Sequence, residues 1–307
     1  MDLLQRILQD GGIRTETEYR LCEHSTFRIG GPAKLALFPK DREEMIFSLR
    51  TLAAYGARYT VIGNASNVVF DDRGYDGAIL FTEEYDNIEY DFRKNHLIAC
   101  SGASTASVAN QAMNLSRGGV EFMQGIPGTV GGAVYMNAGA YDGCMADVCE
   151  WSEYYDTNTG KIGVFEGDAQ EFGIRSSIYQ KHPEYIILSA TFVRPRKEMR
   201  QILMRMQTFA KRRRESQPLN LPSAGSVFKR PIGYFAGKLI DECGMKGVRI
   251  GGAQVSEKHA GFIVNRGGAT SNDVKELVEL IRETVFQRTG VMLECEIQFI
   301  EYQAKGL

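Results

Sequence analysis

A short turn between two apolar segments carries residues that can bind an anion through the backbone. It reads Gly63-Asn-Ala-Ser-Asn67 and follows the segment Tyr59-Thr-Val-Ile62. Glycine and asparagine tolerate left-handed backbone angles, and consecutive N–H groups in such a turn can form an anion-binding nest. Ser66 and Asn67 add side-chain donors. The residues alone fit an anion site and a plain turn between two strands equally well.

A second passage is glycine-rich and free of charge. It runs from Gly125-Ile-Pro-Gly-Thr-Val-Gly-Gly-Ala133 to Asn137-Ala-Gly139. Small residues let a backbone approach a ligand closely, and a helix N-terminus inside such a stretch favours phosphate. Close packing between elements is the alternative use of these glycines. The length of the passage favours ligand binding over packing alone.

The standard dinucleotide motifs are absent from the chain. No Gly-x-Gly-x-x-Gly occurs, and Gly233-Tyr-Phe-Ala-Gly-Lys238 is one residue short of a P-loop. The six cysteines form no Cys-x-x-Cys pair, which indicates neither a zinc site nor a redox pair, so we expect no metal. Four histidines and the lack of a Gly-x-Ser-x-Gly elbow argue against a hydrolase triad.

Local patterns predict the elements that must position these loops. Asp41 caps a helix with Glu44 three residues later, and Gly56 ends that helix. Thr270 and Asp273 form a capping box for a second helix, which Gly290 ends. Strands are expected at 59–62, 68–70, 88–92, 96–100, 148–155, 185–193, 253–255, 261–264 and 293–300, and further helices at 107–115, 197–214 and 234–243.

Length and composition describe an ordinary globular protein. The chain has 307 residues, 43% hydrophobic and 24% charged, with a net charge of −2. Two or three lobes are expected, and nothing indicates nucleic acid as a partner. The N-terminus lacks a signal-peptide pattern, and no run approaches about 18 apolar residues, so we expect no membrane association. We expect a cytoplasmic monomer with reduced cysteines.

Several of these segments together resemble UDP-N-acetylenolpyruvoylglucosamine reductase. The shared motifs are the Gly63–Asn67 turn, the glycine-rich passage, Phe172-Gly-Ile-Arg-Ser-Ser177, Pro222-Ser-Ala-Gly-Ser-Val-Phe-Lys-Arg-Pro231 and Leu293-Glu-Cys-Glu-Ile297. They occur in the family's order from about Ser25 to Phe299. The chain length is that of the family's short form, which has no extra loop over the active site.

The resemblance implies an α+β fold. A two-lobed FAD-binding unit of the vanillyl-alcohol-oxidase type is expected at 1–86 and 87–204, and a smaller C-terminal α+β substrate domain at 205–307. FAD and NADPH are the implied cofactors, and the substrate is a nucleotide sugar. NADPH reduces the flavin, and UDP-N-acetylglucosamine enolpyruvate then takes hydride at C3 and a proton at C2. The product, UDP-N-acetylmuramate, is used in peptidoglycan synthesis.

The resemblance also implies the cofactor contacts. The first turn would hold the FAD pyrophosphate, and the second passage would line the flavin. The implied residues are Gly63, Asn64, Ala65, Ser66, Asn67, Gly125, Ile126, Pro127, Gly128, Thr129, Gly131, Gly132, Asn137, Ala138 and Gly139.

Three residues match the family's catalytic positions: Arg175, Ser226 and Glu296. Hydride addition at C3 pushes charge onto the substrate carboxylate, which a guanidinium can face with two donors. Ser226 matches the proton donor to C2. Strand alternation places Glu296 on one polar face with Glu294, and only the resemblance selects Glu296. The alternatives are a surface arginine, a turn serine and a solvated glutamate.

Other polar residues are candidates for substrate binding. Lys229 and Arg230 follow Ser226 closely, although some family members carry Asn where Arg230 stands. The run Lys211–Arg214 could hold the substrate diphosphate or the NADPH phosphates, or be a solvated helix face. His259 either reaches the substrate or is a hydrogen-bonded structural histidine.

Two other functions compete with this one. An FAD-dependent oxidase of a small alcohol or hydroxy acid would use the same scaffold, pass electrons to oxygen and need no NADPH. A flavin- or nucleotide-sugar-binding protein without catalysis would have no activity to lose when Ser226 is replaced.

Overall fold

The computed structural model describes residues 2–303, which divide into two compact units. Unit 1 comprises the residues up to Thr17, Leu35–Asn64 and Gly77–Arg213. Unit 2 comprises Glu18–Lys34, Ala65–Asp76 and the residues from Arg214 onward. Both units draw on segments far apart in the sequence, so this division does not test where the three expected domains begin and end.

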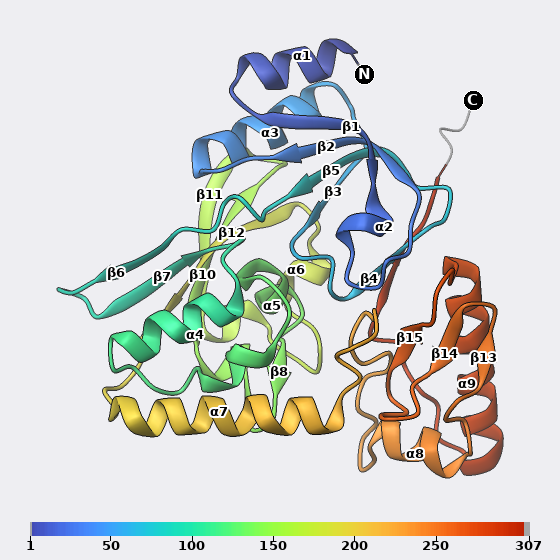
Figure 1. The fold of residues 1–307 in the computed structure, drawn as a ribbon. Helices are drawn as coiled ribbons and strands as arrows, with labels where there is room; N and C mark the ends of the chain where they lie inside the picture. The colour runs from blue at the N-terminus through green and yellow to red at the C-terminus, as the bar shows by residue number, and fades with distance from the viewer. Residues whose placement is uncertain (1, 304–307) are drawn as a thin grey trace. The chain divides into compact units, whose positions relative to one another are not determined.

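The first sheet has the strand order β1-β2-β5-β3 (Figure 1). Its strands are β1 (Arg14–Arg20), β2 (Pro32–Phe38), β3 (Tyr59–Ile62) and β5 (Tyr75–Phe81), and β3 runs parallel to β5. Helices α1 (Asp2–Asp10) and α3 (Arg42–Ala54) belong to its core. The side chain of Asp41 accepts the Glu44 amide, so the predicted cap of α3 is confirmed.

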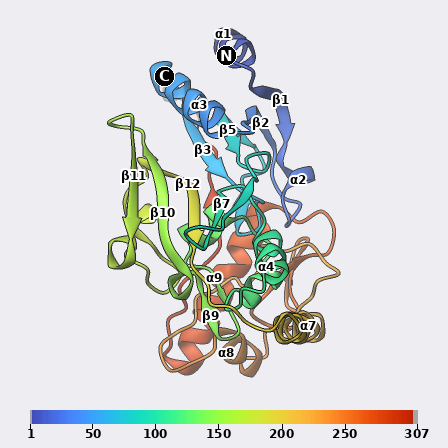
Figure 2. The ribbon, with the colours of Figure 1, turned by 90° about the vertical axis from the view of Figure 1, so that its left-hand side faces the viewer.

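The second sheet lies within unit 1 and has the order β11-β10-β12-β7-β6, with β11 to β7 visible in Figure 2. All four neighbouring pairs are antiparallel. The strands are β6 (Ile88–Asp91), β7 (His96–Cys100), β10 (Cys149–Asp156), β11 (Lys161–Glu166) and β12 (Tyr185–Phe192). Strand β11 was not expected from the sequence.

Short helices and one long helix complete unit 1. They are α4 (Thr105–Asn114), η1 (Glu121–Gly125), α5 (Val130–Tyr135), η2 (Met145–Asp147), η3 (Gly167–Gln170), α6 (Ile178–Lys181) and α7 (Met199–Ser216), with the strand pair β8 (Gly139–Ala140) and β9 (Gly143–Cys144) between α5 and η2. Helix α7 continues past Arg213 into unit 2. Its apolar side chains Ile202, Met206 and Phe209 join the core formed by α4, α5 and the second sheet.

Unit 2 is built around the helix α9 (Ser271–Thr289). Both hydrogen bonds of the predicted Thr270–Asp273 capping box are present, and Gly290 ends the helix at φ 73°. The other elements are α2 (Leu21–His24), β4 (Val68–Phe70), α8 (Ala236–Glu242), β13 (Arg249–Ile250), β14 (Ala253–Val255), β15 (Ile263–Asn265) and β16 (Gln298–Ile300). The stripe Val274, Leu277, Ile281 and Val285 is fully buried in the core of this unit.

The single strand expected at 293–300 is wrong over 293–297. Only β16 is a regular strand, and it runs parallel to β4. Before it, Cys295 forms an isolated antiparallel bridge with Phe228. The segment changes partners between Glu296 and Gln298, and an alternating sequence does not reveal such a change.

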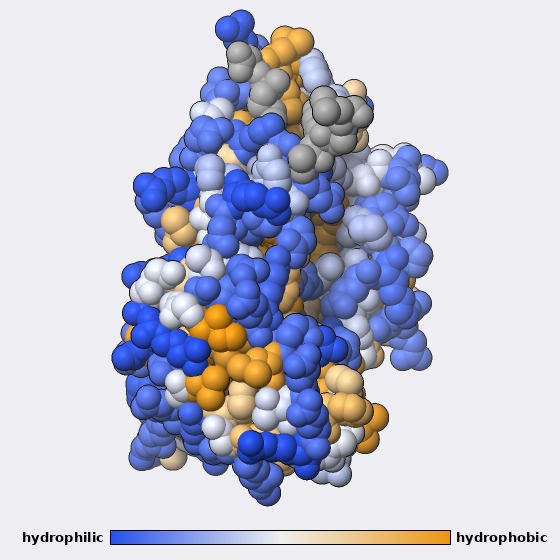
Figure 3. Space-filling view, turned by 90° about the vertical axis from the view of Figure 1, so that its right-hand side faces the viewer, coloured by the Kyte–Doolittle hydropathy of each residue, from blue (hydrophilic) through white to orange (hydrophobic). Residues whose placement is uncertain are grey.

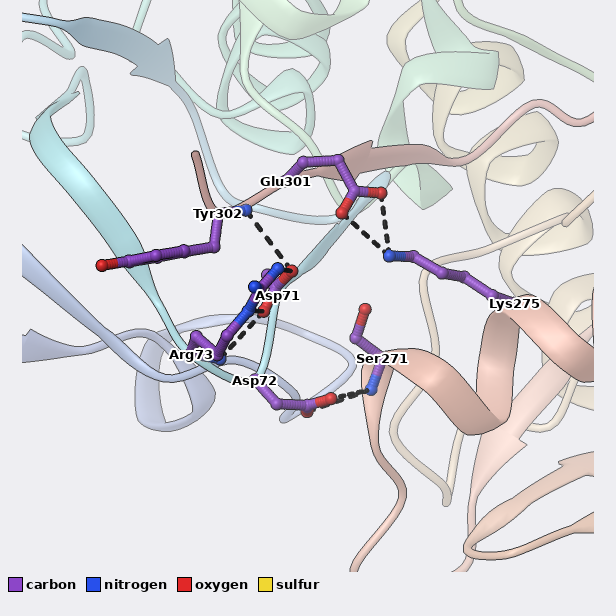
Figure 4. A network of polar contacts seen from close by, with 7 residues as sticks. All are labelled: Asp71, Asp72, Arg73, Ser271, Lys275, Glu301 and Tyr302. Atoms are coloured by element: carbon purple, nitrogen blue, oxygen red, sulfur yellow. Dashed lines mark hydrogen bonds and ion pairs between the residues drawn. The ribbon is translucent and has the colours of Figure 1, made fainter. Parts of the chain in front are cut away.

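A polar network in unit 2 joins the end of β4, the start of α9 and the segment after β16 (Figure 4). Asp71 accepts from both Nε and Nη2 of Arg73 and from the amide of Tyr302. Asp72 accepts the Ser271 amide at 2.9 Å, and Lys275 pairs with Glu301 at 2.8 Å. These contacts hold the C-terminal end of β4 against the start of α9 and against the segment that follows β16.

No helix in the described residues is long and apolar enough to cross a membrane. The face drawn in Figure 3 is mainly hydrophilic, with several separate groups of apolar residues, most of them in its lower part.

Candidate functional site

The turn after β3 has the geometry of an anion nest. Ala65 adopts a left-handed backbone angle, with φ 45°. Within residues 2–303, the amides of Asn64, Ala65 and Ser66 donate to no protein acceptor. Neighbouring amides without protein partners in a turn of this kind suit a phosphate oxygen. The donors that an FAD pyrophosphate requires are therefore present.

In unit 1 this turn is joined to the glycine-rich passage. The Asn64 amide group donates to the Pro127 carbonyl at 2.8 Å. A Cβ atom on Gly63 would lie 2.3 Å from the Thr129 hydroxyl oxygen. Only glycine permits this approach, because any larger residue would push the two loops apart.

The start of α5 does not offer the free amides that the sequence suggested. Val130 donates to Ala103 and Gly131 to Ser101, each at 2.8 Å. The Gly132 amide donates to the Thr129 side chain. The expectation that a helix N-terminus in this passage binds phosphate is therefore wrong, because its amides already have acceptors. What remains is a surface of small, uncharged residues.

Asn137 and Arg175 are coupled in unit 1. Asn137 is buried, donates to the Gly173 carbonyl at 2.8 Å and accepts the Ala146 amide at 2.9 Å. The Arg175 guanidinium donates to the carbonyls of Asn137 and Gly139, at 3.4 and 3.2 Å. Both Asn137 and Arg175 have positive φ angles, 41° and 54°. The Asn137 side chain therefore holds the loop, and the loop carbonyls orient Arg175.

In unit 2 the end of the turn is tied to two other segments. The Ala65 carbonyl accepts from Thr26, whose hydroxyl also donates to Ser223 at 2.8 Å. The Asn67 side chain donates to the Glu296 carbonyl at 3.2 Å, and the Gln298 amide donates to the Asn67 carbonyl at 2.9 Å. The turn, the Ser223 loop and the Glu296 segment therefore meet in one unit.

Ser226 and Glu296 lie on adjacent paired segments in unit 2. The Glu296 amide donates to the Val227 carbonyl at 2.7 Å, and Ser226 bridges Phe262. Both residues are half-buried. Within residues 2–303 the Ser226 hydroxyl makes no hydrogen bond, so it is available to a ligand.

The remaining basic candidates have partners in unit 2. Lys229 forms an ion pair with Glu294 at 2.5 Å, and the Glu294 side chain is 72% exposed. Arg230 is exposed and lies over the Phe235 ring at 4.0 Å. The alternating sequence placed Glu294 and Glu296 on the same polar face, but the structure gives them different surroundings. Glu294 is solvated and paired with a lysine, whereas Glu296 is half-buried beside Ser226.

His259 is held by its own turn. Its Nδ1 accepts the Gly261 amide at 3.1 Å, and its ring packs edge-on against Phe262. Burial lowers the pKa of His259, and the charge of Lys246 acts in the same direction. A neutral histidine that accepts a backbone hydrogen bond fits the structural alternative that the sequence left open.

One residue of these sites escaped the sequence analysis, and another was a candidate only as part of the run Lys211–Arg214. Thr26 links the turn to the Ser223 loop, and nothing in its local sequence indicates this. Arg213 packs against Gly125, and in the sequence it is one of four adjacent basic residues. Its distance from Phe209 on α7 does not separate it from its neighbours, because Arg212 and Arg213 lie three and four residues after Phe209.

Comparison with known proteins agrees with this geometry. Residues 33–165 match an FAD binding domain, and residues 217–300 match the C-terminal domain of UDP-N-acetylenolpyruvoylglucosamine reductase. The chain is similar to the reductase of Caldicellulosiruptor bescii, with 45% identity over 95% of this chain and 93% of the relative. A Clostridium botulinum reductase is 41% identical over 91% of this chain and 90% of its own length.

A solved structure supports the same assignment. The crystal structure of the Thermus caldophilus reductase matches with a TM-score of 0.77 and 33% identity, over 95% of this chain and 99% of that one. The expected combination of an FAD-binding domain and a reductase C-terminal domain is confirmed. The chain therefore belongs to the UDP-N-acetylenolpyruvoylglucosamine reductase family, a family of FAD-dependent oxidoreductases.

Proposed function

We propose that the protein uses NADPH and FAD to reduce UDP-N-acetylglucosamine enolpyruvate to UDP-N-acetylmuramate, in peptidoglycan precursor synthesis. The observation that carries this proposal is the set of hydrogen bonds in unit 2. It joins the end of the candidate cofactor turn to the segments of Ser226 and Glu296. The end of a cofactor turn, a free hydroxyl and a carboxylate in one unit suit a reductase that must also deliver a proton.

FAD, when bound, transfers hydride between NADPH and the substrate. Asn64, Ala65 and Ser66 would hold its pyrophosphate, because their amides have no protein acceptor. The residues of the glycine-rich passage would lie along the flavin, where small side chains allow close approach.

Arg175 would face the substrate carboxylate. Hydride addition at C3 of a conjugated enol ether moves charge onto that carboxylate, so a guanidinium there stabilises the transition state more than the ground state. The carbonyls of Asn137 and Gly139 hold the guanidinium in place before substrate binds. This arrangement avoids reorganisation during the reaction.

Ser226 would protonate C2. A serine hydroxyl is a weak acid, and an enolate is a strong enough base to take its proton. Glu296, half-buried on the adjacent segment, would stabilise the same intermediate through a hydrogen bond or orient the substrate. Lys229 and Arg230 would bind the anionic part of the nucleotide sugar, and His259 would shape the site as a neutral residue.

We further propose a cytoplasmic monomer. The six cysteines are all unpaired in the described residues, as expected in a reducing compartment. Size-exclusion chromatography with light scattering would measure the mass in solution, and a dimer mass would contradict this part of the proposal.

The deciding experiment measures NADPH oxidation by the FAD-loaded protein with and without UDP-N-acetylglucosamine enolpyruvate. Oxidation that requires the enolpyruvyl substrate and yields UDP-N-acetylmuramate would support the proposal. A flavin-loaded protein that ignores this substrate but consumes oxygen with small alcohols would favour the oxidase. A protein that binds FAD and the nucleotide sugar but turns over neither would be a binding protein.

A further inference from the structure

Arg175 has a backbone conformation that residues other than glycine rarely adopt. It lies in the tight turn 173–176, where Gly173 and Ser176 form an isolated antiparallel bridge, and its φ angle is 54°. A left-handed angle costs energy at a residue with a Cβ atom, and it persists only where neighbouring contacts hold it. The Arg175 peptide therefore needs support from outside its own turn.

The side-chain amide of Gln180 supplies such support. Its Nε2 donates to the Arg175 carbonyl and to the Tyr135 carbonyl, each at 3.0 Å. An amide nitrogen of this kind carries two N–H groups, so one can be directed at each carbonyl. A single side chain therefore joins the Arg175 peptide to the C-terminal end of α5.

Both ends of this link are fixed within unit 1, where α5 and α6 lie next to each other (Figure 1). Tyr135 is the last residue of α5, and its carbonyl also accepts the Ser177 hydroxyl at 2.8 Å. Gln180 lies on α6, whose buried Tyr179 shares a 2.7 Å hydrogen bond with Ser152. The amide thus extends from one anchored helix to the end of another, with the Arg175 carbonyl between them.

We infer that Gln180 is a positioning residue for Arg175, whose peptide it holds in the left-handed conformation from which the guanidinium reaches the carbonyls of Asn137 and Gly139. This inference rests on the proposed function, in which Arg175 faces the substrate carboxylate. Gln180 itself touches neither substrate nor flavin. It acts by keeping the guanidinium in place, so that charge developing on the carboxylate meets donors that are already oriented.

Ser177 provides a matched comparison for this role. Its buried hydroxyl donates to the same Tyr135 carbonyl as Gln180, but among the described residues it makes no hydrogen bond to the Arg175 peptide. Removing the Ser177 hydroxyl weakens the contact between α5 and α6. Removing the Gln180 amide weakens the same contact and also releases Arg175, so the two variants separate stability from positioning.

The test compares Gln180→Met, Gln180→Lys and Ser177→Ala with wild type in anaerobic stopped-flow measurements of both half-reactions. Met has a similar length and no donor, whereas Lys restores donors on a long side chain. In Gln180→Met, transfer from reduced flavin to the enolpyruvyl substrate should slow about 10- to 100-fold, as expected when a catalytic group is displaced. Flavin reduction by NADPH should not change, because that step places no charge on the carboxylate. Gln180→Lys should recover most of the lost rate, and Ser177→Ala should transfer hydride at nearly the wild-type rate.

A binding measurement tests the link to the carboxylate directly. UDP-N-acetylmuramate carries the carboxylate and UDP-N-acetylglucosamine lacks it, so the ratio of their dissociation constants reports on Arg175. By isothermal titration, Gln180→Met should bind UDP-N-acetylmuramate about tenfold more weakly, as expected for a misaligned hydrogen bond to a charged group. Its affinity for UDP-N-acetylglucosamine should stay at the wild-type value.

Two results would overturn the inference. One is an unchanged rate of hydride transfer in Gln180→Met. The other is a loss that Ser177→Ala shares in full, because Gln180 would then act only on the contact between α5 and α6. Melting curves identify variants that do not fold, and Gln180→Glu, which keeps the shape of the side chain and loses its donors, replaces Gln180→Met in that case.

A third readout does not depend on the reaction. If wild type does not reduce the enolpyruvyl substrate, the proposed function fails, and the Arg175 Nε–H signal in the NMR spectrum of protein with isotope-labelled arginine still tests the positioning. Its absence from the spectrum of Arg175→Lys assigns this signal. It should be sharp in wild type and Ser177→Ala and broadened in Gln180→Met, because an unsupported turn samples several conformations. An identical signal in all three proteins would make Gln180 a packing residue.

Discussion

The Glu296 amide donates a 2.7 Å hydrogen bond to the carbonyl of Val227, the residue that follows Ser226. The Asn67 side chain donates to the carbonyl of the same Glu296. Glu296 is thus held on both sides of its peptide, once by the segment of the proposed proton donor and once by the turn proposed to bind pyrophosphate. Both bonds are made by the Glu296 backbone, so replacing the side chain leaves them intact. A substitution at Glu296 can therefore test its role in catalysis without removing these structural contacts.

Ser226→Ala should separate the two half-reactions. NADPH should still reduce the flavin, because this step needs no proton from Ser226. Transfer to the enolpyruvyl substrate should slow about 10²- to 10⁴-fold, the usual contribution of a positioned acid. Anaerobic stopped-flow absorbance follows each step. Ser223→Ala, in the same loop, is the control, and product formation by Ser226→Ala at the wild-type rate would show that another group is the acid.

Glu296→Gln and Glu294→Gln should have different effects. Glu294 is exposed and paired with Lys229, and exposed pairs contribute about 0–1 kcal/mol, so its variant should turn over nearly as wild type. Glu296 is half-buried beside the Ser226 segment, and its variant should lose at least about tenfold in kcat, equivalent to about 1.4 kcal/mol of transition-state stabilisation. Steady-state kinetics measure both variants. Equal losses would mean that the Lys229 pair acts in catalysis.

Sequence patterns predicted correctly those helices whose ends are set by hydrogen bonds between residues close together in the sequence. The helix α9 follows its capping box and Gly290 because a cap is completed within a few residues. The strand expected at 293–300 failed because strand pairing depends on distant partners, here Phe228 and then β4. Strand β11 was missed for the same reason, since its pairing with β10 and not its own sequence makes it a strand.

The candidate site was accessible to sequence only through family motifs. Alternation could not separate Glu294 from Glu296, because the distinction comes from the ion pair with Lys229 across the Phe228–Cys295 bridge. Likewise, four adjacent basic residues on a helix point in different directions. Only the packing of α7 against Gly125 distinguishes Arg213 from its neighbours.

Asn137→Ala should destabilise the protein and disorder the loop that carries Arg175. The variant leaves the Gly173 carbonyl and the Ala146 amide without their partners, and each lost buried hydrogen bond costs about 1–3 kcal/mol. Denaturant unfolding with bound FAD should therefore show a loss of about 2–6 kcal/mol for the two bonds together. Asn114→Ala, at the end of α4, is the control. An unchanged stability combined with weaker FAD binding would instead indicate that the Asn137 side chain contacts the cofactor.

Asp71→Asn should remove a pH-dependent contribution to stability. The hydrogen bonds and charge of Arg73, with the Tyr302 amide, hold the pKa of Asp71 well below its usual range. A carboxyl whose folded pKa is depressed stabilises the fold above its unfolded pKa of about 3.9 and loses this contribution as the pH falls toward the folded value. Wild type should therefore be more stable than the variant at pH 7, by about 1–3 kcal/mol. The difference should shrink as the pH falls below about 4, toward the lowered pKa of the folded state. Urea unfolding followed by circular dichroism measures it, and a difference that stays constant down to pH 2 would show that the contribution of Asp71 does not depend on its charge.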